Sequence, residues 1–417
     1  MPQTLKLAAS QSRTLDTTAE TLRSLEDTTR TAASQGIDLI LFPEAFLGGY
    51  PRTCTFGAAV GARDPFGREQ FLQYFHSAVD LGDTPTGSGD DWIERRLPVA
   101  KGTSHRGDGT REELEQIARE TKVFIVTGLV EKSGGTLYCA VVYVCPQNGV
   151  LGKRRKVMPT GSERLIWGQG QPSSLRAVTT TIRGVKLTLA AAICWENYMP
   201  LLRHSLYSQN VNVYLAPTAD ARDTWLPLMR TIGAEGRAFV LSANQCVTRQ
   251  HLPAWVRGDT PEKSDHRTQE INSPAAGQDS NVVQDTALNG STVADDESRP
   301  SRRRASVVTQ TPERHEICWP AADSAGKPGQ EPVSTAAKSS NGAESDFVSR
   351  GGSCIVSPLG EVLAGPLWEV EDGGLLTVEV DFEDCERGRL DLDVAGSYSR
   401  NDAFKLTVEG LELDPPP

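Results

Sequence analysis

The chain lacks any apolar run long enough to cross a membrane, which takes roughly 20 consecutive residues. Its first residues, MPQTLKLAASQSRTLDTTAE, also lack the basic and then apolar order of a secretory signal. We therefore expect no membrane partner and a cytoplasmic location.

An excess of positive charge is absent as well. The chain has 43 Lys and Arg against 54 Asp and Glu, a formal net charge of −11 and an isoelectric point near 5.2. Because surfaces that bind nucleic acid are basic, we expect no nucleic-acid partner. Apolar residues make up only 38% of the chain, which indicates that a polar stretch dilutes an otherwise ordinary core.

The cysteine and histidine patterns that hold disulfides or metals are missing. The 8 cysteines are scattered without a C-x-x-C pair, and the 6 histidines show no H-x-x-x-H spacing. We expect reduced thiols and no metal site. The glycine patterns of dinucleotide and phosphate sites do not occur, so we also expect no cofactor.

What the chain does contain is an alternation of amphipathic helical patterns with buried apolar strands. This alternation predicts an α/β fold built in layers, and hairpin signals such as Asn148-Gly149 make part of the sheet antiparallel. Helices are expected at residues 14–36, 111–122 and 195–209, a helix and then a strand within 229–246, and strands at 6–10, 37–44, 123–132, 185–194, 211–217, 351–366 and 373–384.

One block, residues 258–346, does not fit this pattern. It consists mainly of Ser, Asp, Gly, Pro, Thr, Ala, Gln and Glu, which cannot bury enough apolar surface to offset chain entropy. We interpret it as a low-complexity, disordered insertion between residues 1–257 and 347–417, which together form one domain. Only residues 301–320 hold enough apolar side chains to pack onto a core.

Reactive side chains stand at three expected strand ends: Glu44, Lys156 and Cys194. Cys194 ends the apolar run VKLTLAAAIC where a helix is expected to start, and free backbone N–H groups there favour a thiolate or a developing anion. A carboxylate, an ammonium and a thiol can serve as base, electrophile and nucleophile, which suggests a hydrolase. Position alone leaves open a core role for Cys194 and a surface turn for Lys156. Most of the cysteines, with Cys139, Cys145 and Cys354 among them, are expected to be inert core.

Several segments resemble the nitrilase branch of the carbon–nitrogen hydrolase superfamily. They are FPEAFLGGYPR, GKRRKVMPTGSERLIWGQG, AAICWENYMPLLRHSLY, EGRAFVLSANQ, RGGSCIVSPLGEVLAGPLWE and DLDVAGSYSRNDAF, in the family's order. The resemblance implies a Glu–Lys–Cys triad with a second glutamate, which fall on Glu44, Lys156, Cys194 and Glu163. It also implies a four-layer α-β-β-α sandwich that associates into homodimers or longer spiral homo-oligomers, with residues 1–257 and 347–417 forming the catalytic domain and its C-terminal assembly tail.

The resemblance further implies hydrolysis of a small-molecule nitrile, aromatic or arylaliphatic by preference, to a carboxylic acid and ammonia through a thioimidate and a thioester. Tyr50, Trp167 and Trp195 are candidates for the substrate-binding wall, with core packing as the alternative for each. An amidase, a hydratase that stops at the amide, and a non-catalytic scaffold remain alternatives. The chain departs from the family at Ser397, where relatives usually carry histidine, and at Asn401, where they carry proline. These departures leave substrate preference and oligomer contacts open.

Overall fold

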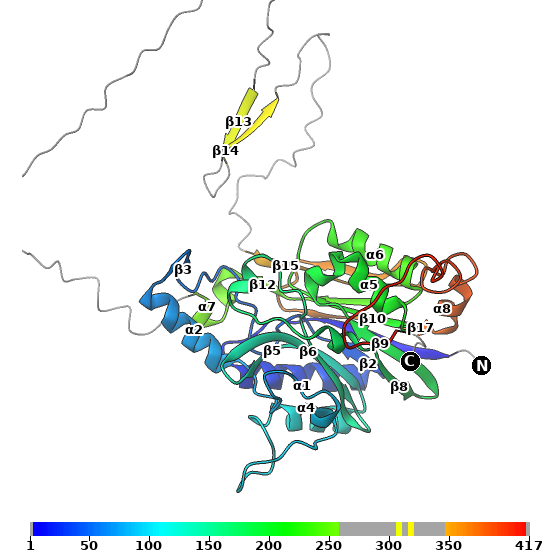
Figure 1. Cartoon of the computed structure of the whole chain (residues 1–417), viewed down its shortest axis with the longest axis horizontal. Coiled ribbons are helices and arrows are strands. Elements are labelled where there is room, and N and C mark those ends of the chain that lie inside the picture. The colour runs from blue at the N-terminus through cyan, green and yellow to red at the C-terminus, as the bar shows by residue number, and fades with distance from the viewer. Residues whose placement is uncertain (1–2, 258–305, 311–315, 321–346, 414–417) are drawn as a thin grey trace, which may run out of the picture. The chain divides into compact units, whose positions relative to one another are not determined.

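The computed structural model describes residues 3–257, 306–310, 316–320 and 347–413 (Figure 1). The chain divides into two compact units, residues 1–267 with 345–417 and residues 268–344. In the second unit, strands β13 (Ser306–Gln310) and β14 (Glu316–Pro320) pair antiparallel, within the segment whose composition allowed packing. The remainder of the insertion, for which the sequence predicts disorder, lies outside the described residues.

The first unit contains a six-stranded sheet in the order β17-β1-β2-β5-β6-β7. Strand β2 pairs parallel with both β1 and β5. The other pairs, β17 with β1, β6 with β5 and β7 with β6, are antiparallel. The expected turn at Asn148-Gly149 connects β6 to β7, and Gly149 has a φ of +71° there. The strands are β1 (Thr4–Gln11), β2 (Leu39–Leu41), β5 (Phe124–Ser133), β6 (Thr136–Cys145), β7 (Gly149–Arg155) and β17 (Gly374–Asp381).

A second, seven-stranded sheet has the order β12-β15-β11-β10-β9-β8, with β16 paired to β15. Its central strands β9, β10 and β11 are parallel. Since β15 pairs with both β11 and β12, it brings residues after 346 into a sheet that residues before 258 begin. The strands are β8 (Val178–Ile182), β9 (Val185–Ala191), β10 (Val213–Thr218), β11 (Phe239–Asn244), β12 (Cys246–Thr248), β15 (Phe347–Val356) and β16 (Val362–Trp368).

Helices cover the outer face of each sheet. Helices α1 (Thr18–Ser34) and α4 (Thr110–Thr121) lie over the first sheet, and α5 (Pro200–Tyr207) and α6 (Trp225–Gly236) lie over the second (Figure 1). The expected four-layer α-β-β-α sandwich is therefore confirmed. The remaining elements of this unit are β3 (Ala58–Ala59), β4 (Ala62–Arg63), α2 (Pro65–Ser77), α3 (Asp90–Ile93), α7 (Ala254–Arg257), α8 (Glu383–Gly388) and the 3₁₀ turns η1 (Gly161–Leu165), η2 (Pro172–Leu175), η3 (Cys194–Tyr198) and η4 (Arg249–His251).

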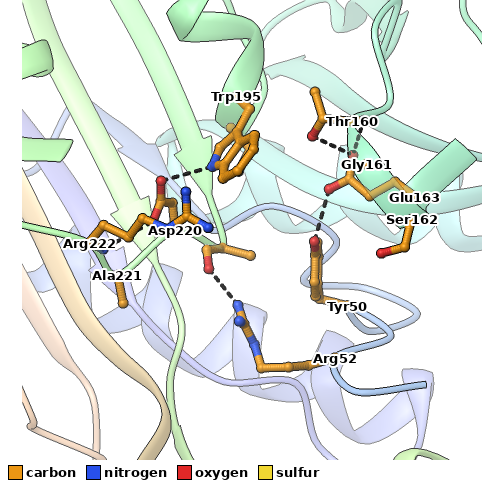
Figure 2. A pocket seen from close by; sticks show the side chains of 12 residues that line it. Tyr50, Arg52, Thr160, Gly161, Ser162, Glu163, Trp195, Asp220, Ala221 and Arg222 are labelled. Atoms are coloured by element: carbon orange, nitrogen blue, oxygen red, sulfur yellow. Dashed lines mark hydrogen bonds and ion pairs between the residues drawn. The ribbon is translucent and has the colours of Figure 1, made fainter. Parts of the chain in front are cut away.

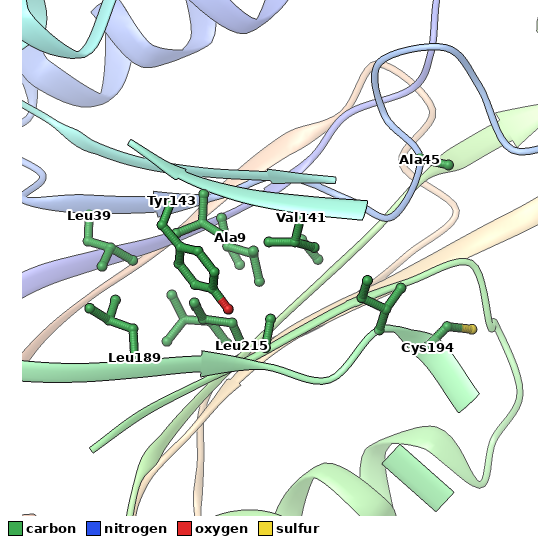
Figure 3. Close-up of a cluster of buried hydrophobic side chains, with 14 of the residues drawn as sticks. Ala9, Leu39, Ala45, Val141, Tyr143, Leu189, Cys194 and Leu215 are labelled. Carbon is green, nitrogen blue, oxygen red and sulfur yellow. The ribbon is translucent and has the colours of Figure 1, made fainter. Parts of the chain in front are cut away.

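Strand β2 is apolar throughout because both of its faces are buried. In β2, Leu39 and Leu41 belong to the core between the sheets, whereas Ile40 packs in the core under α1 and α4. Figure 3 shows Leu39 and Val141 of the first sheet facing Leu189 and Leu215 of the second. Because successive side chains point to opposite faces, the single apolar run of β2 contributes to two cores and leaves no position for a polar residue.

The helix expected over residues 195–209 is wrong in its first turn. Residues Cys194–Tyr198 form the 3₁₀ turn η3, Met199 is extended with φ −92° and ψ 103°, and α5 starts only at Pro200. Proline lacks an N–H and its ring disfavours helical geometry in the preceding residue, so the chain must break there. Among the described residues, no helix combines the length and apolarity that a membrane span requires.

Candidate active site

The exits of several strands open onto one cavity of about 410 Å³. In Figure 2, Tyr50 and Glu163 stand on one side of it and Trp195, Asp220 and Arg222 on the other. Cys194 is part of the wall, so its thiol can meet a molecule in the cavity. The lining residues are Tyr50, Arg52, Thr160, Gly161, Ser162, Glu163, Cys194, Trp195, Ala219, Asp220, Ala221 and Arg222.

Lys156 lies at the centre of a buried charge cluster. It directly follows β7, is fully buried, and donates from Nζ to Glu44 Oε1 and to Glu163 Oε2, both at 2.8 Å. Burial lowers the pKa of Lys156, but the adjacent charges of Glu44 and its neighbours outweigh this and hold it well above the usual value. Lys156 is therefore an ammonium ion that two carboxylates neutralise.

Glu44 presents two different carboxylate oxygens. Oε1 accepts from Lys156 Nζ and from the Cys139 thiol, whose Sγ lies 3.6 Å away, while Oε2 has no hydrogen-bond partner among the described residues. Glu44 is fully buried, and this burial raises its pKa, although the charge of Lys156 opposes the rise. A carboxylate with a raised pKa and a free oxygen is a stronger base than an exposed one.

Cys194 occupies a strained turn. It has a φ of +52°, a left-handed value that non-glycine residues adopt rarely, and only 4% of it is exposed. Its sulfur accepts a hydrogen bond from Thr218 Oγ1 at 3.3 Å. Burial and the nearby charge of Glu44 raise the pKa of Cys194, and the five-residue turn η3 does not offset them, so the sulfur keeps its proton at rest.

Glu163 is anchored at both carboxylate oxygens. Its Oε2 accepts from the backbone N–H of Thr160 at 2.8 Å as well as from Lys156, and its Oε1 accepts from the Tyr50 hydroxyl at 2.9 Å. These contacts fix the carboxylate against Lys156. The structure thus brings Glu44, Lys156 and Glu163 into one hydrogen-bonded cluster and Cys194 onto the wall of the adjoining cavity.

The three aromatic candidates lie in different environments. Tyr50 and Trp195 line the cavity, and Trp195 Nε1 donates to Asp220 Oδ2 at 2.8 Å while the Arg222 guanidinium stacks 4.3 Å above its ring. Trp167 does not line the cavity. It is buried behind it, with its ring edge-on to Tyr50 at 5.6 Å and its Nε1 bonded to the Tyr74 hydroxyl.

The structure also shows residues that the sequence analysis missed. Glu196, fully buried, accepts from Arg154 with both carboxylate oxygens at 2.7 Å and from the backbone N–H groups of Val157 and Ile193 at 2.8 Å. It therefore ties the residue after Lys156 to the residue before Cys194. The sequence signal that could have identified Glu196 is its charge close to an apolar run, because a buried charge needs a partner.

Cys139 lies in the core as expected, fully buried, and its thiol also donates to Glu44 Oε1, with Sγ 3.6 Å away. The departure at Ser397 is remote from the site, since this exposed residue lies in a turn of the C-terminal segment and does not line the cavity. In the described part of the chain, no cluster of three or more His, Cys, Asp or Glu side chains could hold a metal ion.

The chain is similar to known proteins of one family. The carbon–nitrogen hydrolase family model matches residues 6–389. An arylacetonitrilase from Trametes versicolor (strain FP-101664) is 35% identical, over 98% of this chain and 98% of that protein. A bifunctional nitrilase/nitrile hydratase from Nicotiana tabacum is 32% identical, over 95% of this chain and 84% of that protein. The crystal structure of an amidase from Nesterenkonia sp. is 16% identical with a TM-score of 0.49, covering 93% of this chain and 95% of that one.

The family model over residues 6–389 and the relatives matched over nearly their whole length define the class. The chain belongs to the carbon–nitrogen hydrolase family. Within that family it falls in the nitrilase branch, to which its sequence relatives belong.

Proposed function

We propose that this protein is a cysteine-dependent nitrilase, which converts an organic nitrile and two waters into a carboxylic acid and ammonia. The observation that carries the proposal is the buried Lys156 ammonium, bonded at 2.8 Å to both Glu44 and Glu163, beside a cavity whose wall includes Cys194. Nitrilase names among full-length relatives support the same reaction.

In the first half-reaction, Cys194 is the nucleophile and Glu44 the general base. Because burial raises the pKa of Cys194, the sulfur keeps its proton at rest and must lose it during attack. The free Oε2 of Glu44 takes that proton while sulfur bonds to the nitrile carbon, and one carbon–nitrogen π bond breaks. Lys156 and the backbone N–H of Trp195 stabilise the negative charge on nitrogen, and Glu44 returns the proton to give a thioimidate.

The second half-reaction consumes two waters. Glu44 deprotonates the first as it adds to the thioimidate carbon, the second carbon–nitrogen π bond breaks, and Glu44 passes that proton to the nitrogen. The carbon–nitrogen σ bond then breaks while the proton of the new hydroxyl moves to the nitrogen, so ammonia leaves and a thioester remains. The second water, activated by the same carboxylate, releases the acid and restores the Cys194 thiol. Glu163 orients Lys156 throughout, since Tyr50 and Thr160 hold its own oxygens.

An amide product is the second candidate, because one full-length relative is named as both nitrilase and nitrile hydratase. The amide arises from the same tetrahedral intermediate when the carbon–sulfur bond breaks before the carbon–nitrogen bond. Quantifying ammonia, amide and acid from one nitrile panel distinguishes an acid-forming enzyme from a hydratase. An amidase would release ammonia from amides and leave every nitrile intact.

The decisive experiment traps the intermediate. We expect incubation with a nitrile, acid quench and intact-mass analysis to show an acyl adduct that peptide mapping assigns to Cys194. Cys194→Ala should lower ammonia release about a thousandfold or more, whereas Cys354→Ala, which removes a buried thiol elsewhere, should retain activity. Parent-rate ammonia release by Cys194→Ala, or the absence of turnover of any nitrile, would refute the proposal and favour a scaffold role.

Substrate class, assembly and location extend the proposal. The cavity of about 410 Å³ with Tyr50 and Trp195 in its wall suits a small aromatic or arylaliphatic nitrile.

Self-association into homodimers or spirals is supported by exposed apolar side chains, with Leu201 70%, Leu390 89% and Phe404 73% accessible. Light scattering and electron microscopy would test it. The cytoplasmic location stays a prediction.

A further inference from the structure

Two buried thiols, not one, lie beside the candidate base. Cys194 lines the cavity, whereas Cys139, on β6, is fully buried and is not among the lining residues. Glu44 and Lys156 are likewise fully buried and outside the lining residues, and the Cys139 Sγ lies 3.6 Å from Glu44 Oε1. This second thiol has no role in the reaction described above.

We propose that Cys139 is a positioning residue for the nitrilase reaction: its thiol donates to Glu44 Oε1 and, together with Lys156, fixes the carboxylate so that Oε2 is left for the Cys194 proton. The proposal rests on the proposed function, since it concerns the same base. It assigns Cys139 no bond to substrate and no exchanged proton.

The hydrogen-bond pattern of the carboxylate supports this division of labour. Oε1 receives both donors, Lys156 Nζ at 2.8 Å and Cys139 Sγ at 3.6 Å, while the buried Oε2 receives none from the described residues. A carboxylate oxygen that already has two donors is occupied, so the proton from Cys194 must go to the other one.

The backbone couples the two donors. The amide N–H of Lys156 donates to the carbonyl oxygen of Cys139 at 2.7 Å. Cys139 thus holds the lysine through its main chain and the glutamate through its side chain. Because β6 is buried on both faces, its backbone has little freedom to move, and both donors keep their positions.

Cys139 is a donor and not a second base. Burial and the charge of Glu44 raise its pKa well above the usual value, so it keeps its hydrogen at every pH at which the enzyme would work. The other titratable groups that act on Glu44 are Lys156 after β7, Glu163 in η1, Cys194 in η3, Tyr50 in the loop after β2 and Tyr74 in α2. Removing Cys139 leaves all of these in place.

The test compares substitutions at Cys139 with substitutions at Cys145, a second buried thiol on the same strand. Cys139→Val fills the space without a donor and Cys139→Ser keeps a donor. We expect Cys139→Val to lower kcat about tenfold with little change in KM, and to move the acidic limb of the kcat/KM profile to higher pH, because the Glu44 anion loses a hydrogen bond. Cys139→Ser should move the acidic limb of the kcat/KM profile back toward the pH at which it lies in the parent enzyme.

Cys145→Val is the matched control for packing, since Cys145 is 3% exposed and has no part in the cluster. It should cost similar thermal stability and leave the acidic limb unchanged. The inference is overturned if Cys139→Val shows the parent limb, or if the Cys139 and Cys145 variants change the profile equally.

A second readout separates failure of this inference from failure of the proposed function. The pH dependence of Cys194 alkylation by iodoacetamide reports base assistance without any nitrile. If the parent hydrolyses no nitrile, the proposed function fails, while a higher-pH shift of alkylation in Cys139→Val still supports the positioning role. An unshifted alkylation profile refutes that role whatever the substrate.

Discussion

At the residue scale, burial sets the chemistry of the site. Glu44, Lys156 and Cys194 are all nearly or fully excluded from solvent, which penalises the charged form of each. Lys156 keeps its charge because two carboxylates surround it, whereas the pKa values of Glu44 and Cys194 both rise. The proton therefore rests on sulfur next to a strengthened base, ready to transfer when a substrate arrives.

This arrangement predicts the pH dependence of the reaction. Glu44 must be ionised to accept the thiol proton, so kcat/KM should fall as pH drops through its pKa. Since burial raises that pKa, the acidic limb should lie above about 4.3, the value of an unperturbed glutamate. A pH–rate profile with circular dichroism at each pH would check this, and full activity down to pH about 4 would contradict it.

Glu196 should matter for stability as well as activity. Glu196→Gln leaves the buried Arg154 without its counter-charge, and we expect the free energy of unfolding to fall by about 3 kcal/mol or more. It should also lower kcat, since Glu196 joins the segments that carry Lys156 and Cys194. Urea denaturation and steady-state kinetics would measure both effects.

The matched control for Glu196 is Glu369→Gln. Glu369 pairs with Arg350 at 2.8 Å, but the two side chains are 43% and 47% exposed. Its loss should change stability by less than about 1 kcal/mol, because solvent screens exposed pairs. Equal effects of the two substitutions would show that the Arg154–Glu196 pair is not the anchor described here.

At the element scale, the site depends on close approach between backbones. Gly128 of β5 lies against the turn that carries Glu44, and a Cβ there would come within 2.2 Å of the Pro43 carbonyl oxygen and 2.8 Å of Glu44 Cα. No side chain fits in that space. The base is thus positioned by a neighbouring strand as well as by its own.

Gly128→Ala should therefore displace the Glu44 turn. We expect it to destabilise the protein by about 1–3 kcal/mol through overpacking and to reduce kcat more than KM. Gly135→Ala, in the turn between β5 and β6, is the control because a Cβ there meets nothing within 4 Å. Thermal unfolding and kinetics of both variants would decide, and a fully active Gly128→Ala would be inconsistent with this close approach.

At the scale of the whole chain, strand β15 joins its two ends. It follows the 258–346 block and pairs with β11 and β12, which precede that block. Two long segments of sequence are consequently parts of one sheet, and the covalent connection between them is not what holds them together.

Limited proteolysis tests this view. Because the composition of residues 258–346 predicts disorder, we expect rapid cleavage there, with the two fragments remaining associated through β15 and the nitrilase activity retained. Gel filtration followed by denaturing electrophoresis would show co-eluting fragments. Resistance of the block to cleavage would overturn the predicted disorder, and separation of the fragments would overturn the role of β15.

Patterns along the chain were enough for the layers and most elements. Apolar runs bounded by helical patterns predicted the α/β class, and motif resemblance predicted the four layers and the candidate residues Glu44, Lys156, Glu163 and Cys194. The helix break at Met199 could have been predicted too, because Pro200 is visible in the sequence and acts locally. These features depend on neighbours in sequence or on matched motifs.

The sequence by itself determined the layered fold, the acidic surface charge and the residue types available for chemistry. Only the tertiary structure decided that Cys139 contacts Glu44, that Trp167 lies behind the cavity wall, and that Glu196 joins two strand exits. It also decided that the pKa of Cys194 is raised above that of an ordinary thiol, because desolvation is set by every element packed around it. Local patterns fix which way a side chain points, but burial and hydrogen-bond partners come from segments far apart in the chain.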